Sequence, residues 1–531
     1  MANNCKYYKQ QRQVSYDGGV TWQNLDEYQR GELYQSYSED CGTVLQYRWV
    51  VLENQYYCNG TSRYAKEQKQ ISYDNGQTWQ NVSPAEYRAG QIVEYNSEIC
   101  GYVPSPYSEQ YLTIESLEDN NEISYKGKSS DSVYATPISA STNGGMTWFR
   151  VVPDRENTPK TIATLNAGQK LLLKGENASY TKTVSMHNNR FLSTKRVDVY
   201  GNIMSLIYGD LFYGQTAITS AYTFTWLFEG TDVVNSSNLI LPSNVTSYCY
   251  AGMFSGCTNL ISTPLLPATT MAARCYYQMF EDCTSLTTAP ALPATTLASH
   301  CYTSMFEDCT SLTTPPVLSA TTLAEGCYAI MFKNCTSLTT PPALPATTLA
   351  KNCYSDMFEG CTSLTTAPVL SATTLAENCY KKMFNGCTSL TTIQSALPAT
   401  TLANNCYEYM FSGCTSLTTA PVLPATSTVT GCYTYMFGGC TSLTTVPEIS
   451  ATYIKGRQSN ESLEVAACCK TFEGCSNLSY IKCMATTIGF AGTVSWVKGV
   501  ASSGTFVKNP SMTNWESGDN GIPTGWTITD A

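Results

Sequence analysis

The chain has 531 residues, which is too long for one ordinary hydrophobic core and predicts several domains or a repeat array. Charged residues make up 14% and the formal net charge is −10, so the chain lacks the basic face that nucleic-acid binding needs. It has no run of about 18 apolar residues, and the N-terminal stretch lacks the apolar region of a secretory signal. We therefore expect neither membrane insertion nor signal-directed export.

Residues 1–102 contain a tandem duplication, which we interpret as two small β-modules. "SYDGGVTW" (15–22) and "SYDNGQTW" (72–79) both fit S-x-D-x-G-x-T-W. The aspartate can accept backbone N–H bonds inside a tight turn, the glycine permits a positive φ, and the tryptophan packs beneath the turn. The motif resembles the Asp-box, which in sialidases braces a hairpin, so we interpret it as structural and not catalytic. Its residues are Ser15, Asp17, Gly19, Trp22, Ser72, Asp74, Gly76 and Trp79.

Four cysteines, Cys5, Cys41, Cys58 and Cys100, flank the two copies. They allow three disulfide pairings, and the sequence does not choose among these or the reduced state.

The next hundred residues alternate apolar and polar side chains between turn signals. This pattern predicts a β-sandwich-like domain over 103–198. It contains a degenerate third copy of the motif, "STNGGMTW" (141–148), in which asparagine replaces the aspartate. We expect residues 199–227 to cap the N-terminal end of the repeat array that follows.

The second half of the chain, residues 228–487, is an array of about ten units. A Met-Phe pair recurs with Phe at 254, 280, 306, 332, 358 and 384, a constant step of 26 residues. Internal periods of this length are typical of solenoids, whose neighbouring units bury a common core. Residues 488–531 lack the repeat and are expected to form a C-terminal cap.

Within one unit, the recurring apolar residues have the spacing of a helix face. Cys301, Tyr302, Met305, Phe306 and Cys309 fall 3, 4, 7, 8 and 11 positions after Ala298, which predicts a helix in each unit. "SLTTPP" (311–316) then predicts a short strand that ends at the prolines. The expected fold is mainly β and α/β repeat, with small β-modules, a β-sandwich-like domain and a leucine-rich-repeat solenoid.

The sixteen cysteines from Cys249 to Cys440 occupy two repeat positions eight residues apart. This is not a zinc spacing, and residues eight apart on a helix are about 12 Å apart, too far for a disulfide. We interpret these cysteines as small buried apolar side chains stacked in ladders. We predict no metal and no cofactor.

Two sets of repeat positions are candidate binding surfaces. In each adjacent Thr pair of the predicted strands, one Thr should point inward and one outward, which would line the concave face with hydroxyls. This ladder is Thr287, Thr313, Thr339, Thr365, Thr391, Thr418 and Thr444. Residues that vary between units should lie on the outward face of the helix. Their variation would reflect either unconstrained drift at solvent-facing positions or a diversified recognition surface. These residues include Tyr277, Gln278, Asp356, Lys381, Lys382, Glu408, Tyr409 and Tyr435.

The repeat "CYxxMFxGCTSLTTAPxLPATTLA" resembles the BspA-like leucine-rich repeats of surface proteins from gut Bacteroidetes and their phages. The resemblance implies non-catalytic adhesion or recognition. No Ser/His/Asp set, H-E-x-x-H motif or phosphate-binding loop points to an enzyme.

We therefore expect a virion protein, such as a tail or head fibre, that binds a host-surface glycan or protein through the solenoid. The N-terminal modules would contact other virion proteins, and a homo-oligomer is possible. The alternatives are an adhesin on the bacterial cell surface and a purely structural decoration protein of the virion.

Overall fold

The computed structural model divides the chain into two compact units, Met1–Pro104 and Ser105–Ala531, and each is considered by itself. The described part of the chain is mostly β, with few helices. It comprises residues 7–9, 15–16, 30–33, 46–59, 62–72, 78–82, 85, 87–94, 110–127, 137–153, 158–175, 189–458, 460–462, 466–513 and 515–531.

The first unit holds two antiparallel sheets. In the first, β1 (Tyr7–Lys9) pairs with β2 (Ser15–Tyr16) and β3 (Arg30–Leu33). In the second, the central strand β5 pairs with all three of its neighbours. These strands are β4 (Gln46–Asn59), β5 (Ser62–Ser72), β6 (Gln80–Asn81) and β7 (Tyr87–Glu94).

The second unit begins with a domain of two sheets. The larger sheet has the order β11-β10-β13-β8-β15-β16, with β17 also paired to β15, and the smaller has the order β12-β9-β14. Residues on β13 alternate between exposed or half-buried and buried, as expected for a strand with one face on a core. The large sheet contains β8 (Leu112–Ser116), β10 (Ile138–Ser141), β11 (Phe149–Val151), β13 (Lys170–Gly175), β15 (Val197–Asn202), β16 (Val233–Asn235) and β17 (Leu239–Ile240). The small sheet contains β9 (Asn121–Gly127), β12 (Lys160–Leu165) and β14 (Asn189–Ser193).

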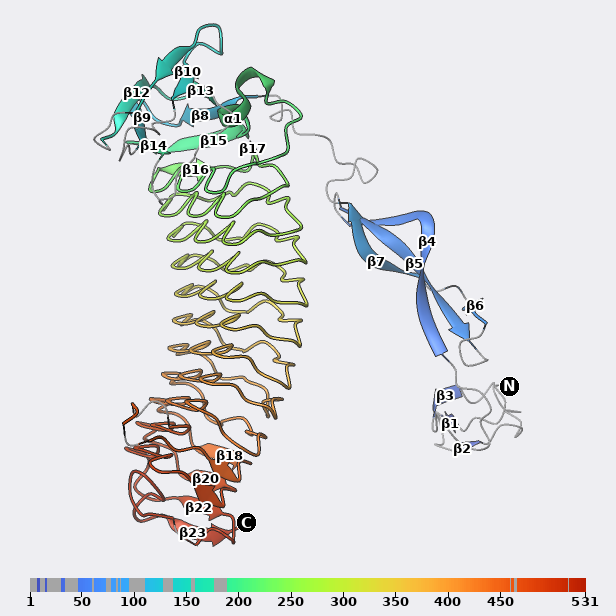
Figure 1. Cartoon of the computed structure of the whole chain (residues 1–531), viewed down its shortest axis with the longest axis vertical. Helices are drawn as coiled ribbons and strands as arrows, with labels where there is room; N and C mark the ends of the chain where they lie inside the picture. Colours follow the sequence, from blue (N-terminus) through green and yellow to red (C-terminus); the bar gives the residue numbers. More distant parts are fainter. Residues whose placement is uncertain are drawn as a thin grey trace. The chain divides into compact units, whose positions relative to one another are not determined.

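This β-domain and the repeats share one sheet and one core (Figure 1). The predicted boundary between residues 198 and 199 falls inside β15, which pairs in parallel with β16 and β17 of the first repeat. Helix α1 (Ser205–Tyr208) and the 3-10 turn η3 (Gly209–Leu211) follow β15. Gly175 permits the close approach of α1, because a Cβ there would lie 1.7 Å from the carbonyl oxygen of Leu206.

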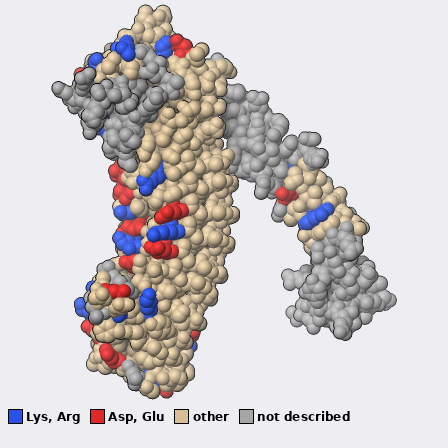
Figure 2. All heavy atoms as spheres, viewed as in Figure 1, with Lys and Arg blue, Asp and Glu red and all other residues tan. Residues whose placement is uncertain are grey.

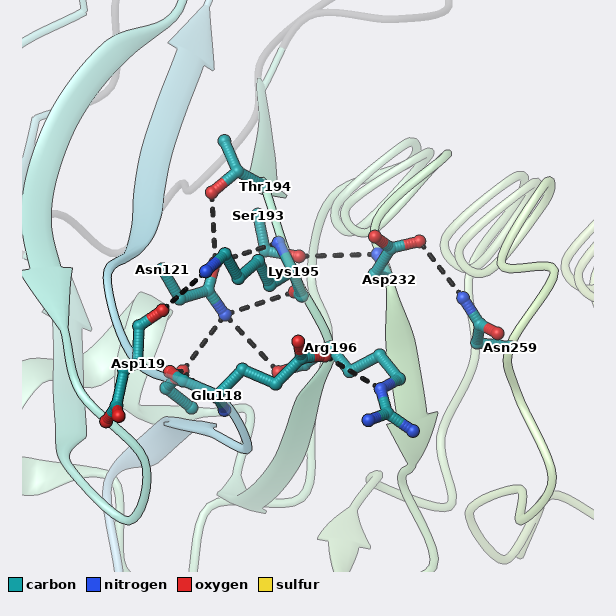
Figure 3. Close-up of polar contacts among 10 residues, drawn as sticks. Glu118, Asp119, Asn121, Ser193, Thr194, Lys195, Arg196, Asp232 and Asn259 are labelled. Carbon is teal, nitrogen blue, oxygen red and sulfur yellow. Dashed lines mark hydrogen bonds and ion pairs between the residues drawn. The ribbon is translucent and has the colours of Figure 1, made fainter.

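A polar network closes the same junction (Figure 3). The buried Asn121 side chain donates to the carbonyl oxygens of Lys195 and Arg196 and accepts the Lys195 N–H. The backbone N–H of Asp232 donates to the Ser193 hydroxyl. The Asp232 carboxylate in turn accepts from the amide of Asn259, one repeat further along. The β-domain is thus a support for the first repeats.

Successive units form a stack of chain turns, here called the repeat stack (residues 222–500), and each turn of about one unit is a coil (Figure 1). The predicted helix in each unit is wrong. The N–H groups of Cys301 and Met305 bond three residues back, to Ala298 and Tyr302, whereas the N–H groups of Tyr302 and Phe306 bond to the next coil. Along this segment, backbone N–H groups therefore bond alternately within their own coil and to the next coil.

This segment is a run of β-turns that advances four residues at a time. Positive φ angles recur at His300 (55°), Ser304 (55°) and Asp308 (59°), and at equivalent positions in other coils. A positive φ at the third residue of a turn is the mark of a type II turn. The apolar spacing of 3, 4, 7, 8 and 11 fits a four-residue period as well as a helical one, which is why the sequence pattern pointed to a helix.

Two aromatic ladders fill the core of the repeat stack. The ring of Phe306 stacks on Phe280 at 5.8 Å and on Phe332 at 5.7 Å, and Tyr302 stacks on Tyr276 and Tyr328 in the same way. The Phe ladder is continuous from Phe191 of the β-domain to Phe472. Stacked rings bury large apolar area and add a geometric preference of about 1 kcal/mol per pair.

The predicted strands are mostly reduced to single bridges between coils, such as Thr288 with Thr314. Proline has no N–H, so residues such as Pro316 interrupt the ladder. A regular parallel sheet forms near the C-terminus, in the order β18-β20-β22-β23, beside the pair β19-β21. These strands are β18 (Thr445–Ile449), β19 (Tyr453–Ile454), β20 (Tyr480–Cys483), β21 (Thr487–Ile488), β22 (Thr505–Lys508) and β23 (Thr527–Asp530).

Both predicted ends of the array need correction. The backbone of Tyr222, within the predicted N-terminal cap, already bonds to Ser247 of the next coil. At the other end, the N–H of Phe472 bonds to the carbonyl of Trp496, within the predicted C-terminal cap. The coil geometry therefore extends beyond the Met-Phe signature, because backbone bonds between coils do not need that signature.

Candidate recognition surface

The seven threonines of the predicted ladder are all exposed, at 287, 313, 339, 365, 391, 418 and 444. The expectation that each Thr pair has one inward member is wrong: Thr313 and Thr314, for example, are both exposed. The hydroxyl of Thr313 donates to the carbonyl oxygen of Thr287 at 3.2 Å, and Thr444 bonds to Thr418 at 3.1 Å. Because these protons are used between coils, the hydroxyl oxygens remain as acceptors for a ligand.

An apolar row lies beside the threonines. After Thr314, exposure alternates in the manner of a strand, with Pro316 and Leu318 buried and Val317 77% exposed. The equivalent positions in neighbouring coils are Leu265, Ala291, Ala343, Val369 and Ala396. Alanine alternates with a larger side chain along this row, so the surface alternates between hollows and ridges.

The segments that carry these rows contain no charged residue in five consecutive coils, at 284–298, 310–324, 336–350, 362–376 and 388–403. We call their exposed side the Thr–Pro face. Figure 2 shows a broad area of the stack without charged side chains, next to an edge where those side chains gather. One hollow of about 400 Å³ lies between two coils, lined by Thr340, Ala343, Pro345, Thr366, Val369 and Ser371 among others.

The residues that vary between units do not point freely outward, contrary to the prediction. Glu408 is only 7% exposed, and the others of the set are half-buried. They pair between coils: Lys381 with Glu408 at 2.8 Å, and Lys382 with Asp356 at 3.9 Å. We call this side the paired edge. Its variation is coupled between neighbours, since a change on one coil alters the partner on the next.

Aromatic side chains on the paired edge also contact one another between coils, and burial there shifts the pKa of a carboxyl group. Tyr409 stacks on Tyr435 at 4.7 Å, and Lys470 donates to the Tyr435 hydroxyl. Tyr277 is half-buried, and Gln278 donates to Glu281. Burial raises the pKa of Glu281 to about 7 despite that hydrogen bond. These contacts satisfy the edge internally, which makes it less available to a ligand than the Thr–Pro face.

The interpretation of the repeat cysteines as buried ladders is confirmed: all sixteen from Cys249 to Cys440 are free and buried. The sequence did not reveal one further role. In each described coil the second cysteine donates its S–H to a phenylalanine carbonyl of the preceding coil, as from Cys309 to Phe280 at 3.0 Å. Burial also raises the pKa of these thiols, to about 12 for Cys361, so they stay protonated donors.

The degenerate third copy of the motif forms a hydrogen-bonded turn. It joins β10 to β11, and Asn143 accepts the N–H of Thr147 at 3.0 Å. Ser141 accepts the N–H of Gly145 at 2.9 Å. The ring of Trp148 packs against Lys174 at 4.2 Å. A turn held in this way braces the hairpin of β10 and β11.

The other two copies fall largely outside the described residues. Asp17, Gly19, Trp22, Asp74 and Gly76 are not described, and only the backbone of Ser15 is. Ser72 is buried, and Trp79 lies under the guanidinium of Arg48 at 4.3 Å. Of the four flanking cysteines, only the backbone of Cys58 is described, so their pairing stays open.

Among the described residues, no group of three His, Cys, Asp or Glu side chains is placed to hold a metal ion. No helix in that part of the chain has the length and apolar character needed to span a membrane.

A family model described as the BspA type leucine-rich repeat region matches residues 225–339 and 328–459, in six copies. No curated protein and no solved structure matches the chain.

Proposed function

Because residues 225–459 belong to the BspA-type leucine-rich repeat family, we propose that this chain is a non-catalytic recognition or adhesion protein. Its solenoid of about ten units binds a host-surface glycan or protein, and the Thr–Pro face is the binding surface.

The observation that carries the proposal is the segregation of charge around the stack. The charged side chains of the paired edge bond to one another between coils, whereas the Thr–Pro face presents hydroxyls and apolar groups over several coils. Val317 and Val369 are 77% and 71% exposed. Soluble proteins rarely leave a long apolar row exposed unless it binds something. A face without charges favours an uncharged ligand, such as a neutral glycan or a polar protein loop.

A second part of the proposal concerns the particle or cell that displays this surface. We propose a virion component, a tail or head fibre, whose N-terminal modules contact other virion proteins. The alternatives are an adhesin on the bacterial cell surface and a structural decoration protein of the virion. Antibodies against the N-terminal modules, imaged on purified phage particles and on bacterial cells, would distinguish these carriers.

The test of recognition is binding of the labelled full chain to a panel of gut Bacteroidetes strains. We expect saturable binding to some strains only. The double variant Val317→Arg/Val369→Arg places two charges on the Thr–Pro face without touching the core, so we expect it to weaken that binding by at least about tenfold, or about 1.4 kcal/mol.

The matched control is Glu325→Gln/Glu377→Gln, which changes the net charge by the same amount outside the Thr–Pro face. This control should bind like the unmodified chain. If no strain binds the unmodified chain, recognition is wrong and the decoration role is favoured. If both double variants weaken binding equally, net charge and not the Thr–Pro face determines it.

A further inference from the structure

A cavity of about 530 Å³ opens at the C-terminal end of the repeat stack. It is formed by the segment around β21, residues 486–494, and by the last loop before β23. Volumes of this size are typical of small-molecule sites. The cavity also lies at the end of a row of threonines in the stack. The hydroxyl of Thr486 donates to the carbonyl oxygen of Thr452, and the hydroxyl of Thr452 donates to the carbonyl oxygen of Thr426.

Two aromatic rings line the cavity. Trp515 stacks face to face on the buried Trp496, at 5.5 Å with an angle of 7° between the rings. Phe490 is 68% exposed, so its ring is accessible to a ligand in the cavity. The indole N–H of Trp515 is buried and has no hydrogen-bond partner in the described part of the chain. A buried donor without a partner costs stability.

Polar groups stand among these rings with hydrogen-bonding capacity to spare. The Oδ1 atom of Asn520 accepts the N–H of Ser495 at 2.7 Å, which fixes the amide and leaves its NH₂ group as a donor. Glu516 is exposed and adds an acceptor, and Thr487 is exposed and adds a hydroxyl. No lysine or arginine is among the residues that line the cavity, and the nearest cation given by the contacts, the Arg457 guanidinium, lies 5.8 Å from the centre of the Phe490 ring.

We propose that this cavity binds one uncharged pyranose sugar. The rings suit the apolar C–H face of a pyranose, and the carboxylate, amide and hydroxyl suit its ring of hydroxyl groups. The carboxylate of Glu516 disfavours sialic acid and phosphorylated sugars. The cavity lies outside the five uncharged segments that define the Thr–Pro face, and the proposal does not depend on the function proposed for that face.

The test is saturation-transfer NMR on the full chain with the methyl glycosides of glucose, galactose, mannose and N-acetylglucosamine. We expect at least one of them to bind. Thr487→Val removes a hydroxyl, and Asn520→Asp keeps the acceptor for Ser495 but removes the NH₂ donor. Each variant should weaken binding by about tenfold. Thr216→Val, at an exposed threonine outside both the cavity and the Thr–Pro face, is the matched control and should bind normally.

The proposal is overturned if none of the four glycosides binds, or if both cavity variants bind as tightly as the unmodified chain. Binding to whole cells separates this result from the proposed function. If the cavity alone is wrong, Thr487→Val and the unmodified chain bind cells equally, while Val317→Arg/Val369→Arg still loses binding.

Discussion

At the scale of single residues, the repeat cysteines act as hydrogen-bond donors as well as packing groups. The thiol of Cys309 is fully buried and donates to the carbonyl oxygen of Phe280. Cys309→Ala removes both the donor and the sulfur volume, so we expect a loss of about 1–2 kcal/mol in the free energy of unfolding. Cys309→Ser keeps a donor and should lose less. Urea denaturation of the three proteins measures the difference, and equal losses would show that the donor has no role.

The buried thiols at the first cysteine position of each coil predict a loss of stability at alkaline pH. Burial raises the pKa of Cys249, Cys327 and Cys353 from 9.0 to about 12. In the unfolded chain these thiols release their protons first, so the stabilisation is complete below pH 9 and is lost as pH rises towards 12. Each thiol contributes about 1.4 kcal/mol per pH unit in that window.

Urea midpoints measured on both sides of pH 9 check this expectation. Cys327→Ala/Cys353→Ala should reduce the steepness of the alkaline loss. A midpoint that does not change with pH up to about 11 would contradict the burial of the thiols.

At the scale of the structural element, the turns of the paired edge require left-handed backbone at fixed positions. Ile330 has φ 62°, a conformation in which a β-branched residue is strained, whereas Asn352 has φ 55° and tolerates it. Ile330→Asn should therefore raise the free energy of unfolding by about 1 kcal/mol, and Asn352→Ile should lower it by a similar amount. Urea denaturation of the two variants tests this prediction, and we expect their midpoints to shift in opposite directions. Shifts of the same sign would show that backbone strain does not cause the change in stability.

Much of the repeat architecture was predictable from the sequence, but the local conformation was not. The step of 26 between phenylalanines indicated stacked units, and Phe306 lies in the shared core. The helix was wrong because its apolar spacing also fits four-residue turns. A missed signal was available: the positive-φ position of Asp308 is Gly in later coils, as at Gly360 and Gly386. Glycine at such positions favours turns over helix.

The candidate site was predictable in part, for a similar reason. The threonine rows could be read from the repeat, because seven consecutive coils carry a threonine at the same position. The burial of Glu408 and its bond to Lys381 could not, since they depend on which residues adjacent coils place side by side. The cavity beside Trp515 combines segments from two coils without the repeat signature, so no sequence period marked it.

At the scale of the second unit, the Phe ladder joins the β-domain to the repeat stack through Phe191 and Phe228, whose rings lie 5.9 Å apart. Only neighbouring coils contact one another in such an array, so its stability is approximately a sum of coil and interface contributions. A single weakened interface should then divide the unit into two parts that unfold separately.

The variants Phe228→Ala and Phe306→Ala test this division. Both residues are fully buried, and each truncation should cost about 3–5 kcal/mol. Hydrogen exchange measured by mass spectrometry in moderate urea should show a boundary of protection at the mutated coil. Phe228→Ala should separate the β-domain from the stack, whereas Phe306→Ala should divide the stack itself. Val317→Ala, at a position 77% exposed, should change stability by less than about 0.5 kcal/mol. A boundary at the same place in both core variants would mean that the β-domain and the stack fold as independent units, and that the continuous ladder does not couple them.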